Sequence, residues 1–315
     1  MPRINVFPKE RKMKIVILDG YTINPGDLDW KALERFGDLT VYDRSAPSEL
    51  IERIGDAEIV FTCKCHMTEE VINACPNIKL ISILATGYDN VDLEAAKNRN
   101  IAVCNVPAYS TECVAQHTFA LMLELCNKVG LHNNAVHGGQ WTTCADFSLS
   151  LATMIQLSGK TLGIVGYGSI GKRVGQIADA FGMKVIPYSK DPESAIKADI
   201  LSLHCPATEE NKGFINKDFI SKMKDGALLV NTARGALINQ EDLVEAVKSG
   251  KLAGAAVDVV AKEPILASNP LLGVENIIIT PHIAWTSIEA RSLIASTSAK
   301  NLDSFLSGGN INRII

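Results

Sequence analysis

The chain has 315 residues, which exceeds the roughly 250–300 residues at which a single core usually divides, so its length indicates two domains. Apolar residues make up 47 % and charged residues 21 %, the balance of a folded globular protein rather than of a disordered chain. The formal net charge is −4 and there is no dense basic run, so nucleic-acid binding is not expected. Apolar runs fall well short of the roughly eighteen residues of a membrane span, so membrane insertion is not expected either.

The N-terminal residues and the cysteines both indicate a cytoplasmic protein. Residues 1–12 are polar, lack the apolar core of a secretory signal and precede a second Met13, so they are predicted to be an N-terminal extension. The eight cysteines include no Cys-x-x-Cys pair, and reduced thiols are expected. Cys63-Lys64-Cys65-His66 looks like half a metal site, but no further ligands follow at a matching spacing, so no metal is predicted.

Strand-like and helix-like segments alternate through the first third of the chain. Short β-branched runs predict strands over residues 14–20, 39–43, 58–63, 79–85 and 101–106. Helical patterns lie between them, over residues 28–36, 48–54, 68–75 and 93–98. This alternation predicts βαβ units and therefore a parallel sheet with helices on both faces.

A long helix is predicted over residues 110–128, followed by a polar stretch over residues 133–143 that contains glycine, and then by a second alternating series. Its strands are predicted over residues 161–165, 184–188, 200–204, 227–232, 254–259 and 276–280. The last element is a helix over residues 287–306, with Thr286 and Glu289 predicted to form a capping box. The fold class predicted is α/β, with two doubly wound parallel-sheet (Rossmann-like) domains separated by a cleft.

A phosphate-binding loop is predicted directly after the strand over residues 161–165. The sequence there is Gly-x-Gly-x-x-Gly, and it opens a helix whose N-terminal N–H groups would face a pyrophosphate. The residues of this loop are Gly166, Gly168, Ser169, Ile170 and Gly171. A strand before the motif and a helix after it make dinucleotide binding the prediction.

The next strand ends in Ser189 and Lys190, where an enzyme that uses NAD usually carries an acidic residue for the ribose 2′-OH. Serine would hydrogen-bond a 2′-phosphate and lysine would neutralise it, although Asp191 lies one residue further on. NAD(P)H is therefore the predicted cofactor, with NADP slightly favoured over NAD.

Three polar residues follow late strands, at the edge of the sheet where doubly wound folds bind their ligands. They are Arg234, Glu263 and His282. An arginine fork binds a carboxylate through two hydrogen bonds, a histidine supplies a proton as hydride arrives, and a glutamate orients the imidazole and favours its protonated form. This combination is what the reduction of a 2-keto acid needs.

At these residues the chain resembles the D-isomer-specific 2-hydroxyacid dehydrogenases, from about residue 14 to the C-terminus. The resemblance rests on Gly163-Ile164-Val165-Gly166-Tyr167-Gly168-Ser169-Ile170-Gly171, Asn231-Thr232-Ala233-Arg234-Gly235, Ala255-Ala256-Val257-Asp258-Val259 with Glu263-Pro264, and Thr280-Pro281-His282-Ile283-Ala284. It implies that Arg234, Glu263 and His282 form the catalytic set, with His282 as acid and base. It also implies a discontinuous substrate domain of residues 13–107 with 284–315, a cofactor domain of residues 108–283, and a homodimer built on the helix over 110–128 and the arm around Gly139-Gln140-Trp141.

The same resemblance implies further contacts with substrate and cofactor. Backbone at Thr86 and Gly87 would help Arg234 hold the substrate carboxylate, and Asp258 would contact the nicotinamide carboxamide. The other residues implied to line the cofactor are His204, Cys205, Pro206, Thr232 and Ala233.

Within this family the chain is most similar to the glycerate dehydrogenases, also called hydroxypyruvate reductases. Lys64 and Trp285 carry this similarity: lysine suits a polar substrate, and tryptophan narrows the pocket and offers an N–H. Hydroxypyruvate or glyoxylate is therefore the expected substrate.

Three alternatives stay open at this point: an NAD(H)-sensing interaction protein on the same fold, another 2-keto acid reductase, and a formate-type dehydrogenase, which Glu263 disfavours.

Overall fold

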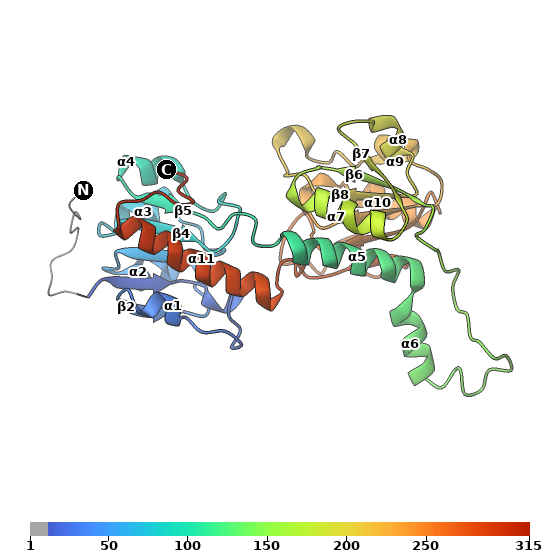
Figure 1. The fold of residues 1–315 in the computed structure, drawn as a ribbon, viewed down its shortest axis with the longest axis horizontal. Helices are drawn as coiled ribbons and strands as arrows, with labels where there is room; N and C mark the ends of the chain where they lie inside the picture. The colour runs from blue at the N-terminus through green and yellow to red at the C-terminus, as the bar shows by residue number, and fades with distance from the viewer. Residues whose placement is uncertain (1–11) are drawn as a thin grey trace. The chain divides into compact units, whose positions relative to one another are not determined.

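The computed structural model describes residues 12–315, so the predicted extension over residues 1–12 lies, apart from its last residue, outside the described residues. The chain forms two compact units (Figure 1). Unit 1 comprises residues 12–109 together with 286–315, and unit 2 comprises residues 110–285. Unit 1 is thus built from the beginning and the end of the chain.

Unit 1 contains a five-stranded parallel sheet in the order β2-β1-β3-β4-β5. Its strands are β1 Lys14–Ile17, β2 Asp38–Val41, β3 Ile59–Thr62, β4 Leu80–Ile83 and β5 Ala102–Cys104. Its α-helices are α1 Lys31–Glu34, α2 Leu50–Ile54, α3 Glu69–Ala74, α4 Leu93–Asn98 and α11 Ile288–Leu306, and the short 3₁₀ turns are η1 Gly20–Thr22 and η2 Pro47–Glu49. Alternate strand residues such as Val16, Val60 and Ile81 share one core with α2, α3 and α4. On the other side, α11 contacts both α1 and β4.

Unit 2 contains a six-stranded parallel sheet in the order β11-β10-β9-β8-β6-β7. Its strands are β6 Thr161–Val165, β7 Lys184–Pro187, β8 Ile200–Leu203, β9 Ala227–Asn231, β10 Leu252–Val257 and β11 Ile277–Ile279. Its helices are α5 Thr111–Asn127, α6 Val129–His137, α7 Ser169–Ala180, α8 Pro192–Ile196, α9 Lys217–Lys222 and α10 Gln240–Lys248, with 3₁₀ turns η3 Glu209–Asn211 and η4 Gly235–Leu237.

Strand β9 shows how unit 2 buries both faces of its sheet. Leu228 and Val230 belong to the core that includes α5 and α7, whereas Ala227 and Leu229 belong to the core that includes α9 and α10. Because side chains alternate along a strand, a fully apolar strand must be covered on both sides. The predicted fold class, two parallel-sheet α/β domains, is confirmed by this architecture.

Three local details differ from or extend the sequence predictions. The last helix is capped by Ser287, which accepts a hydrogen bond from Ala290 N, so the predicted Thr286–Glu289 capping box is wrong by one residue. The polar stretch over residues 133–143 begins inside a helix, α6, which follows α5 after Lys128 adopts a left-handed conformation (φ 52°). Beyond α6, a segment without regular structure, residues 138–155, extends away from the sheet of unit 2 (Figure 1); it is called the arm below.

Each sheet reverses its strand order at one point, between β1 and β3 in unit 1 and between β6 and β8 in unit 2. Loops leaving adjacent strands diverge there to opposite faces, which opens a crevice at the carboxyl ends of the strands. In unit 1, Lys64 follows β3, one of the two strands at the reversal. In unit 2, the glycine loop and His204 follow the two strands at the reversal, β6 and β8, whereas Arg234, Glu263 and His282 follow β9, β10 and β11 in turn.

Candidate active site

The glycine loop of unit 2 has the form that a pyrophosphate needs. Gly166 has φ +93°, and a Cβ placed there would lie 2.4 Å from Cys205 N, so no other residue fits without a shift of backbone. Gly168 is the N-cap of α7, and a Cβ there would meet nothing within 4 Å, which leaves open space in front of the helix. The open space and the N–H groups of α7 together fit a dinucleotide phosphate.

The residues directly after the turn at the end of β7 are exposed, and one of them, Asp191, caps a helix. Ser189 and Lys190 are exposed, and the N–H groups of Lys190 and Asp191 both donate to Pro187 O in a tight turn. Asp191 accepts a hydrogen bond from Ser194 N and caps α8, and its pKa is lowered by this contact. The acidic side chain in this region is therefore engaged by its own helix.

The residues after β8 include a half-buried, neutral imidazole. His204 Nε2 lies 2.8 Å from Ser202 Oγ, and burial lowers the His204 pKa to about 3. Its Nδ1 is buried and has no hydrogen-bond partner among the described residues. Cys205 follows beside the glycine loop, and burial raises the pKa of its thiol.

Glu263 and His282 form a short side-chain contact between two of the predicted catalytic residues. Glu263 Oε2 lies 2.6 Å from His282 Nδ1, and Glu263 Oε1 accepts a hydrogen bond of 3.1 Å from Val260 N. A carboxylate is only an acceptor, so the proton of this contact lies on Nδ1. Nε2 is then the ring nitrogen that can exchange a proton with a substrate.

Arg234 lies on a loop whose backbone makes two hydrogen bonds with the side chain of Asn231. The buried Asn231 donates from Nδ2 to Arg234 O (2.9 Å) and accepts at Oδ1 from Ala233 N (3.0 Å). A Cβ at Gly235 would lie 2.0 Å from the carbonyl carbon of Val260, so the Arg234 loop touches the loop that bonds Glu263. The three predicted catalytic residues therefore belong to three packed loops of one unit.

Asp258 lies directly after β10, and its side chain is 1 % exposed. Its Oδ1 accepts from Thr280 Oγ1 (2.6 Å) and Ile283 N (2.9 Å), and its Oδ2 accepts from Ala284 N (2.9 Å). Burial acts to raise its pKa, but hydrogen bonds from His117, Thr280 and these amides lower it overall. The structure thus gives Asp258 a role in holding the loop that carries His282; its contact with a nicotinamide carboxamide stays a prediction.

Two further predicted residues of unit 2 are Thr232, which follows β9, and Trp285. Thr232 Oγ1 lies 2.9 Å from Thr118 Oγ1 of α5, where Thr118 donates to Val114 O and so accepts from Thr232. Trp285 is half-buried at the end of the segment that begins at His282.

In unit 1, Lys64 is exposed on the loop after β3, and the buried Asp19 arranges this loop. The Asp19 carboxylate accepts from the N–H groups of Cys63 (2.8 Å), Lys64 and Cys65 (3.2 Å). Thr86 donates from Oγ1 to Val106 O (2.8 Å) and accepts at its carbonyl from Asn105, which fixes the segment that leads to Gly87.

Sequence reasoning missed four residues that hold the predicted ones in place: Asp19, Asn231, His117 and Thr280. Thr280 and Asn231 belong to the motifs that carry the family resemblance, but no spacing or neighbouring residue in the sequence indicates which groups they bind. Asp19 ends a strand run and was a visible signal of a strand-end carboxylate.

Among residues 12–315, no group of three or more His, Cys, Asp or Glu is arranged to hold a metal ion. All eight cysteines lie in the described residues and none is bridged. None of the helices described is both long and apolar enough to cross a membrane.

The chain is similar to known proteins over nearly its whole length. Residues 119–284 match the model of the D-isomer specific 2-hydroxyacid dehydrogenase NAD binding domain. A hydroxypyruvate reductase from Blautia hydrogenotrophica is 48% identical over 318 residues, covering 95% of this chain and 99% of the relative. The solved TT0316 protein from Thermus thermophilus is 34% identical with a TM-score of 0.86, covering 96% of this chain and 100% of that one. The acyclic imino acid reductase Bsp5 in complex with NADPH and D-Arg is 30% identical with a TM-score of 0.83, covering 96% and 100% of the two chains.

The chain therefore belongs to the D-isomer-specific 2-hydroxyacid dehydrogenases. It is an oxidoreductase that acts on CH–OH groups with a nicotinamide cofactor, as the sequence predicted. The catalytic roles of Arg234, Glu263 and His282 stay predictions.

Proposed function

We propose that this chain reduces a small, polar 2-keto acid, hydroxypyruvate above all and glyoxylate next, to the corresponding 2-hydroxy acid. The observation that supports it most is the 2.6 Å contact between Glu263 and His282, packed beside the Arg234 loop in the unit that carries the dinucleotide loop. The 48% identity to a hydroxypyruvate reductase supports the choice of substrate.

Each residue of the set has one task. A nicotinamide cofactor held at the glycine loop would supply hydride for the carbonyl carbon of the substrate. His282 donates a proton from Nε2 to the carbonyl oxygen, and Glu263, in contact with Nδ1, keeps the ring in place. Arg234, whose Nη1 also donates to Ala233 O (2.8 Å), binds the substrate carboxylate with its guanidinium fork.

Specificity for a small hydroxylated acid is proposed to come from Lys64 and Trp285. An exposed ammonium on the Asp19-bound loop suits a polar substrate, and the indole offers an N–H and bulk. Backbone at Thr86 and Gly87 is proposed to contact the substrate carboxylate, as in the family the chain belongs to.

The first experiment compares initial rates with hydroxypyruvate, glyoxylate, pyruvate and phenylpyruvate for the native chain and for His282→Ala. General acid catalysis contributes on the order of 10²–10⁴-fold, so we expect His282→Ala to lose about that much kcat on hydroxypyruvate. Lys248→Ala, at the exposed end of α10, is the control and should keep its kcat. Near-native turnover by His282→Ala would refute the assignment. Tight NADH binding without turnover of any keto acid would favour the cofactor-sensing alternative.

Arg234→Lys tests the carboxylate contact separately. An ammonium cannot reproduce the planar two-point contact of a guanidinium, so KM should rise far more than kcat falls. An unchanged KM would contradict the role of Arg234.

We further propose that NADPH is preferred over NADH. The supporting observation is that Asp191, the acidic residue that follows β7, is engaged in capping α8, whereas the exposed Ser189 and Lys190 carry the groups that would bind a 2′-phosphate. Ser189→Asp with Lys190→Ala should shift the ratio of kcat/KM toward NADH by roughly 10–100-fold, the value of one or two charge-assisted hydrogen bonds. A native preference for NADH would refute this preference without touching the reaction.

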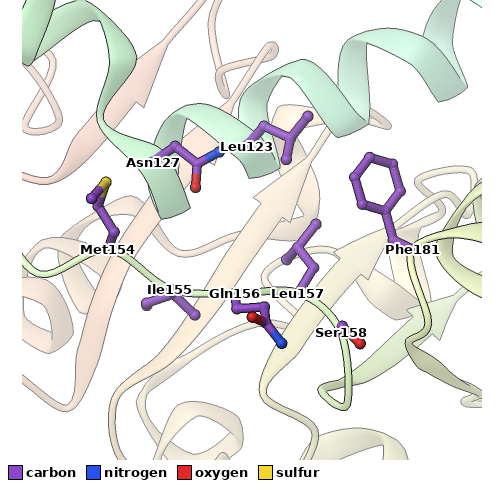
Figure 2. Close-up of a pocket in the computed structure, with 8 residues that line it drawn as sticks. All are labelled: Leu123, Asn127, Met154, Ile155, Gln156, Leu157, Ser158 and Phe181. Atoms are coloured by element: carbon purple, nitrogen blue, oxygen red, sulfur yellow. The ribbon is translucent and has the colours of Figure 1, made fainter.

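A homodimer is proposed as the assembly, with the arm and α6 seated on a second copy of the chain. Apolar side chains gather there with large exposed fractions, Phe147 at 96 %, and monomeric proteins rarely expose such a patch. The others are Val129, Leu131, Val136, Trp141, Leu151 and Met154. Beside the arm, a hollow of about 510 Å³ lies between the end of α5, residues 154–158 and Phe181 (Figure 2).

Sedimentation of the native chain and of the double variant Phe147→Asp, Met154→Asp tests the assembly. We expect a dimer for the native chain and a monomer for the variant, with Ile51→Asp in unit 1 as a matched exposed apolar control that stays dimeric. A native monomer would refute the proposal.

Unbridged cysteines support a cytoplasmic location for this assembly.

A further inference from the structure

Three polar side chains from distant parts of unit 2 meet behind the loop that carries His282. They are His117 of α5, Asp258 after β10 and Thr280 after β11. His117 Nε2 lies 3.1 Å from Thr280 Oγ1 and 3.5 Å from Asp258 Oδ1, and Thr280 Oγ1 lies 2.6 Å from Asp258 Oδ1.

The direction of these hydrogen bonds follows from the protons available. The Asp258 carboxylate only accepts, so the single proton of the Thr280 hydroxyl is donated to it. The hydroxyl oxygen must then accept from His117, which places a proton on His117 Nε2. Donation therefore runs in one direction, from His117 through Thr280 to Asp258.

Asp258 in turn accepts hydrogen bonds from the backbone at and after His282. Its two carboxylate oxygens accept the N–H groups of Ile283 and Ala284, and its carbonyl oxygen accepts the N–H of His282 at 2.8 Å. The N–H of His282 also lies 3.0 Å from Thr280 O. The backbone N–H groups of His282 and of the two residues after it are thus bound by Asp258, and the His282 N–H is also bound by Thr280.

This support matters because His282 has an unfavourable backbone conformation. Its φ is 54°, in the left-handed region that a residue with a Cβ rarely occupies and that persists only where its surroundings determine it. If the loop relaxed, the imidazole would leave the geometry of its 2.6 Å contact with Glu263, and misplacement of about 1 Å costs on the order of 10²-fold in rate.

We propose that His117 and Thr280 are positioning residues for the reduction, which hold the His282 loop in its strained conformation through Asp258. The inference rests on the proposed role of His282 and adds two residues that touch neither Glu263 nor the Arg234 loop in the contacts described. His117 belongs to helix α5 and lies 163 residues before Thr280 in the chain.

The test compares pairs of variants that differ in one hydrogen-bonding group. Thr280→Val keeps the shape of the side chain and removes the hydroxyl, whereas Thr280→Ser keeps the hydroxyl. Likewise His117→Leu removes the donor, whereas His117→Gln keeps an N–H of similar reach. We expect kcat on hydroxypyruvate to fall roughly 10–100-fold in Thr280→Val and less in His117→Leu, with Thr280→Ser and His117→Gln within about threefold of the native value.

A second readout needs neither substrate nor cofactor. Amide hydrogen exchange, read on peptides that cover residues 281–285, should be faster by about tenfold in Thr280→Val and unchanged in Thr280→Ser, because the amides of Ile283 and Ala284 lose an ordered acceptor. Equal kcat in Thr280→Val and Thr280→Ser would overturn the proposal, as would a fall in kcat without faster exchange at residues 281–285. Faster exchange throughout unit 2 would overturn it too, because Thr280 would then support the fold as a whole.

His282→Ala, measured in parallel, separates this proposal from the proposed function. Full activity in that variant refutes the role of His282. An inactive His282→Ala together with a fully active Thr280→Val leaves the reaction intact and refutes only the positioning role of Thr280 and His117.

Discussion

Each unit of this dehydrogenase buries one carboxylate beyond the end of a strand, and comparison of the two shows two ways to hold a site loop. Asp19 follows β1 in unit 1 and Asp258 follows β10 in unit 2, and the two residues are 5 % and 1 % exposed. Both accept the backbone N–H groups of a loop beyond another strand, at Cys63–Cys65 in one case and at Ile283 and Ala284 in the other. Both loops carry a proposed site residue, Lys64 or His282.

The difference lies in what else binds the carboxylate. The Asp19 carboxylate is held mainly by three backbone N–H groups, which loop residues of almost any type would provide, and the Cys65 thiol is its side-chain neighbour. Asp258 also accepts from the Thr280 hydroxyl and lies 3.5 Å from His117, so its loop depends on two additional side chains. We infer that a residue that moves a proton is held more tightly than one that attracts an anion through a flexible side chain, since proton transfer is far more sensitive to geometry.

The largest effect is expected from Asp258→Asn. An amide at this position offers one acceptor oxygen and turns an N–H toward a group that already donates, so at least one loop donor is left unsatisfied. The free energy of unfolding should fall by about 2–3 kcal/mol and kcat by roughly 100-fold. Urea unfolding and steady-state rates on the same preparation measure both, and a native kcat in Asp258→Asn would remove the basis of the comparison.

A smaller and different effect is expected from Asp19→Asn. The loop over residues 63–65 would lose part of its support, so Lys64 would meet the substrate less often while the proton transfer at His282 stays intact. KM for hydroxypyruvate should rise about tenfold, the value of one charge-assisted hydrogen bond, with little change in kcat. A fall in kcat without a rise in KM would show that the two carboxylates do not divide the work in this way.

The parts of this arrangement that could be predicted are those with a local signature. The two parallel sheets follow from alternating apolar runs such as residues 79–85 and 227–232, and the phosphate loop follows from three glycines between a strand and a helix. Arg234, Glu263 and His282 are predicted as the catalytic set because each follows a strand, and unit 2 places their loops together.

The supporting contacts could not be predicted because they join residues that are far apart in the chain. Asp19 reaches a loop 44–46 residues away, and His117 reaches Thr280 over 163 residues, so neither partner is marked by spacing or periodicity. Fine register was also out of reach: the cap of α11 is Ser287 rather than Thr286, since both residues have a hydroxyl and only the backbone geometry decides between them.

A carboxylate at the amino ends of the strands in unit 2, away from the candidate site, provides a control for the Asp19 and Asp258 variants. Asp199 precedes β8 and accepts from Thr161 N and Oγ1 (2.8 Å each) and from Lys224 Nζ (2.6 Å), but its contacts support no proposed site residue. Asp199→Asn should therefore lower the free energy of unfolding without changing kcat or KM. A fall in kcat at constant KM would show that buried carboxylates in unit 2 affect the reaction wherever they lie.

The pH dependence of this control is set by its pKa. Burial alone would raise the Asp199 pKa, but hydrogen bonds from Lys224 and Thr161 lower it from 3.8 to about 2. A depressed pKa means that the carboxylate stabilises the fold fully above about pH 4 and loses this contribution as the pH falls through about 2. At about pH 6 the free energy of unfolding of the native chain should be higher than that of Asp199→Asn by roughly 2 kcal/mol. Urea unfolding should show that this difference becomes smaller below about pH 4.

The smallest effect is expected from the two cysteines that flank Lys64. Asp19 binds their backbone N–H groups, so Cys63→Ala and Cys65→Ala should keep KM for hydroxypyruvate within about twofold and lower stability by only about 1 kcal/mol for the buried sulfur. Burial raises the pKa of both thiols to about 12, so at about pH 8 iodoacetamide should label them in the urea-unfolded chain but not in the folded one. A large rise in KM in either alanine variant would mean that the side chains, and not the amides bound by Asp19, shape the Lys64 loop.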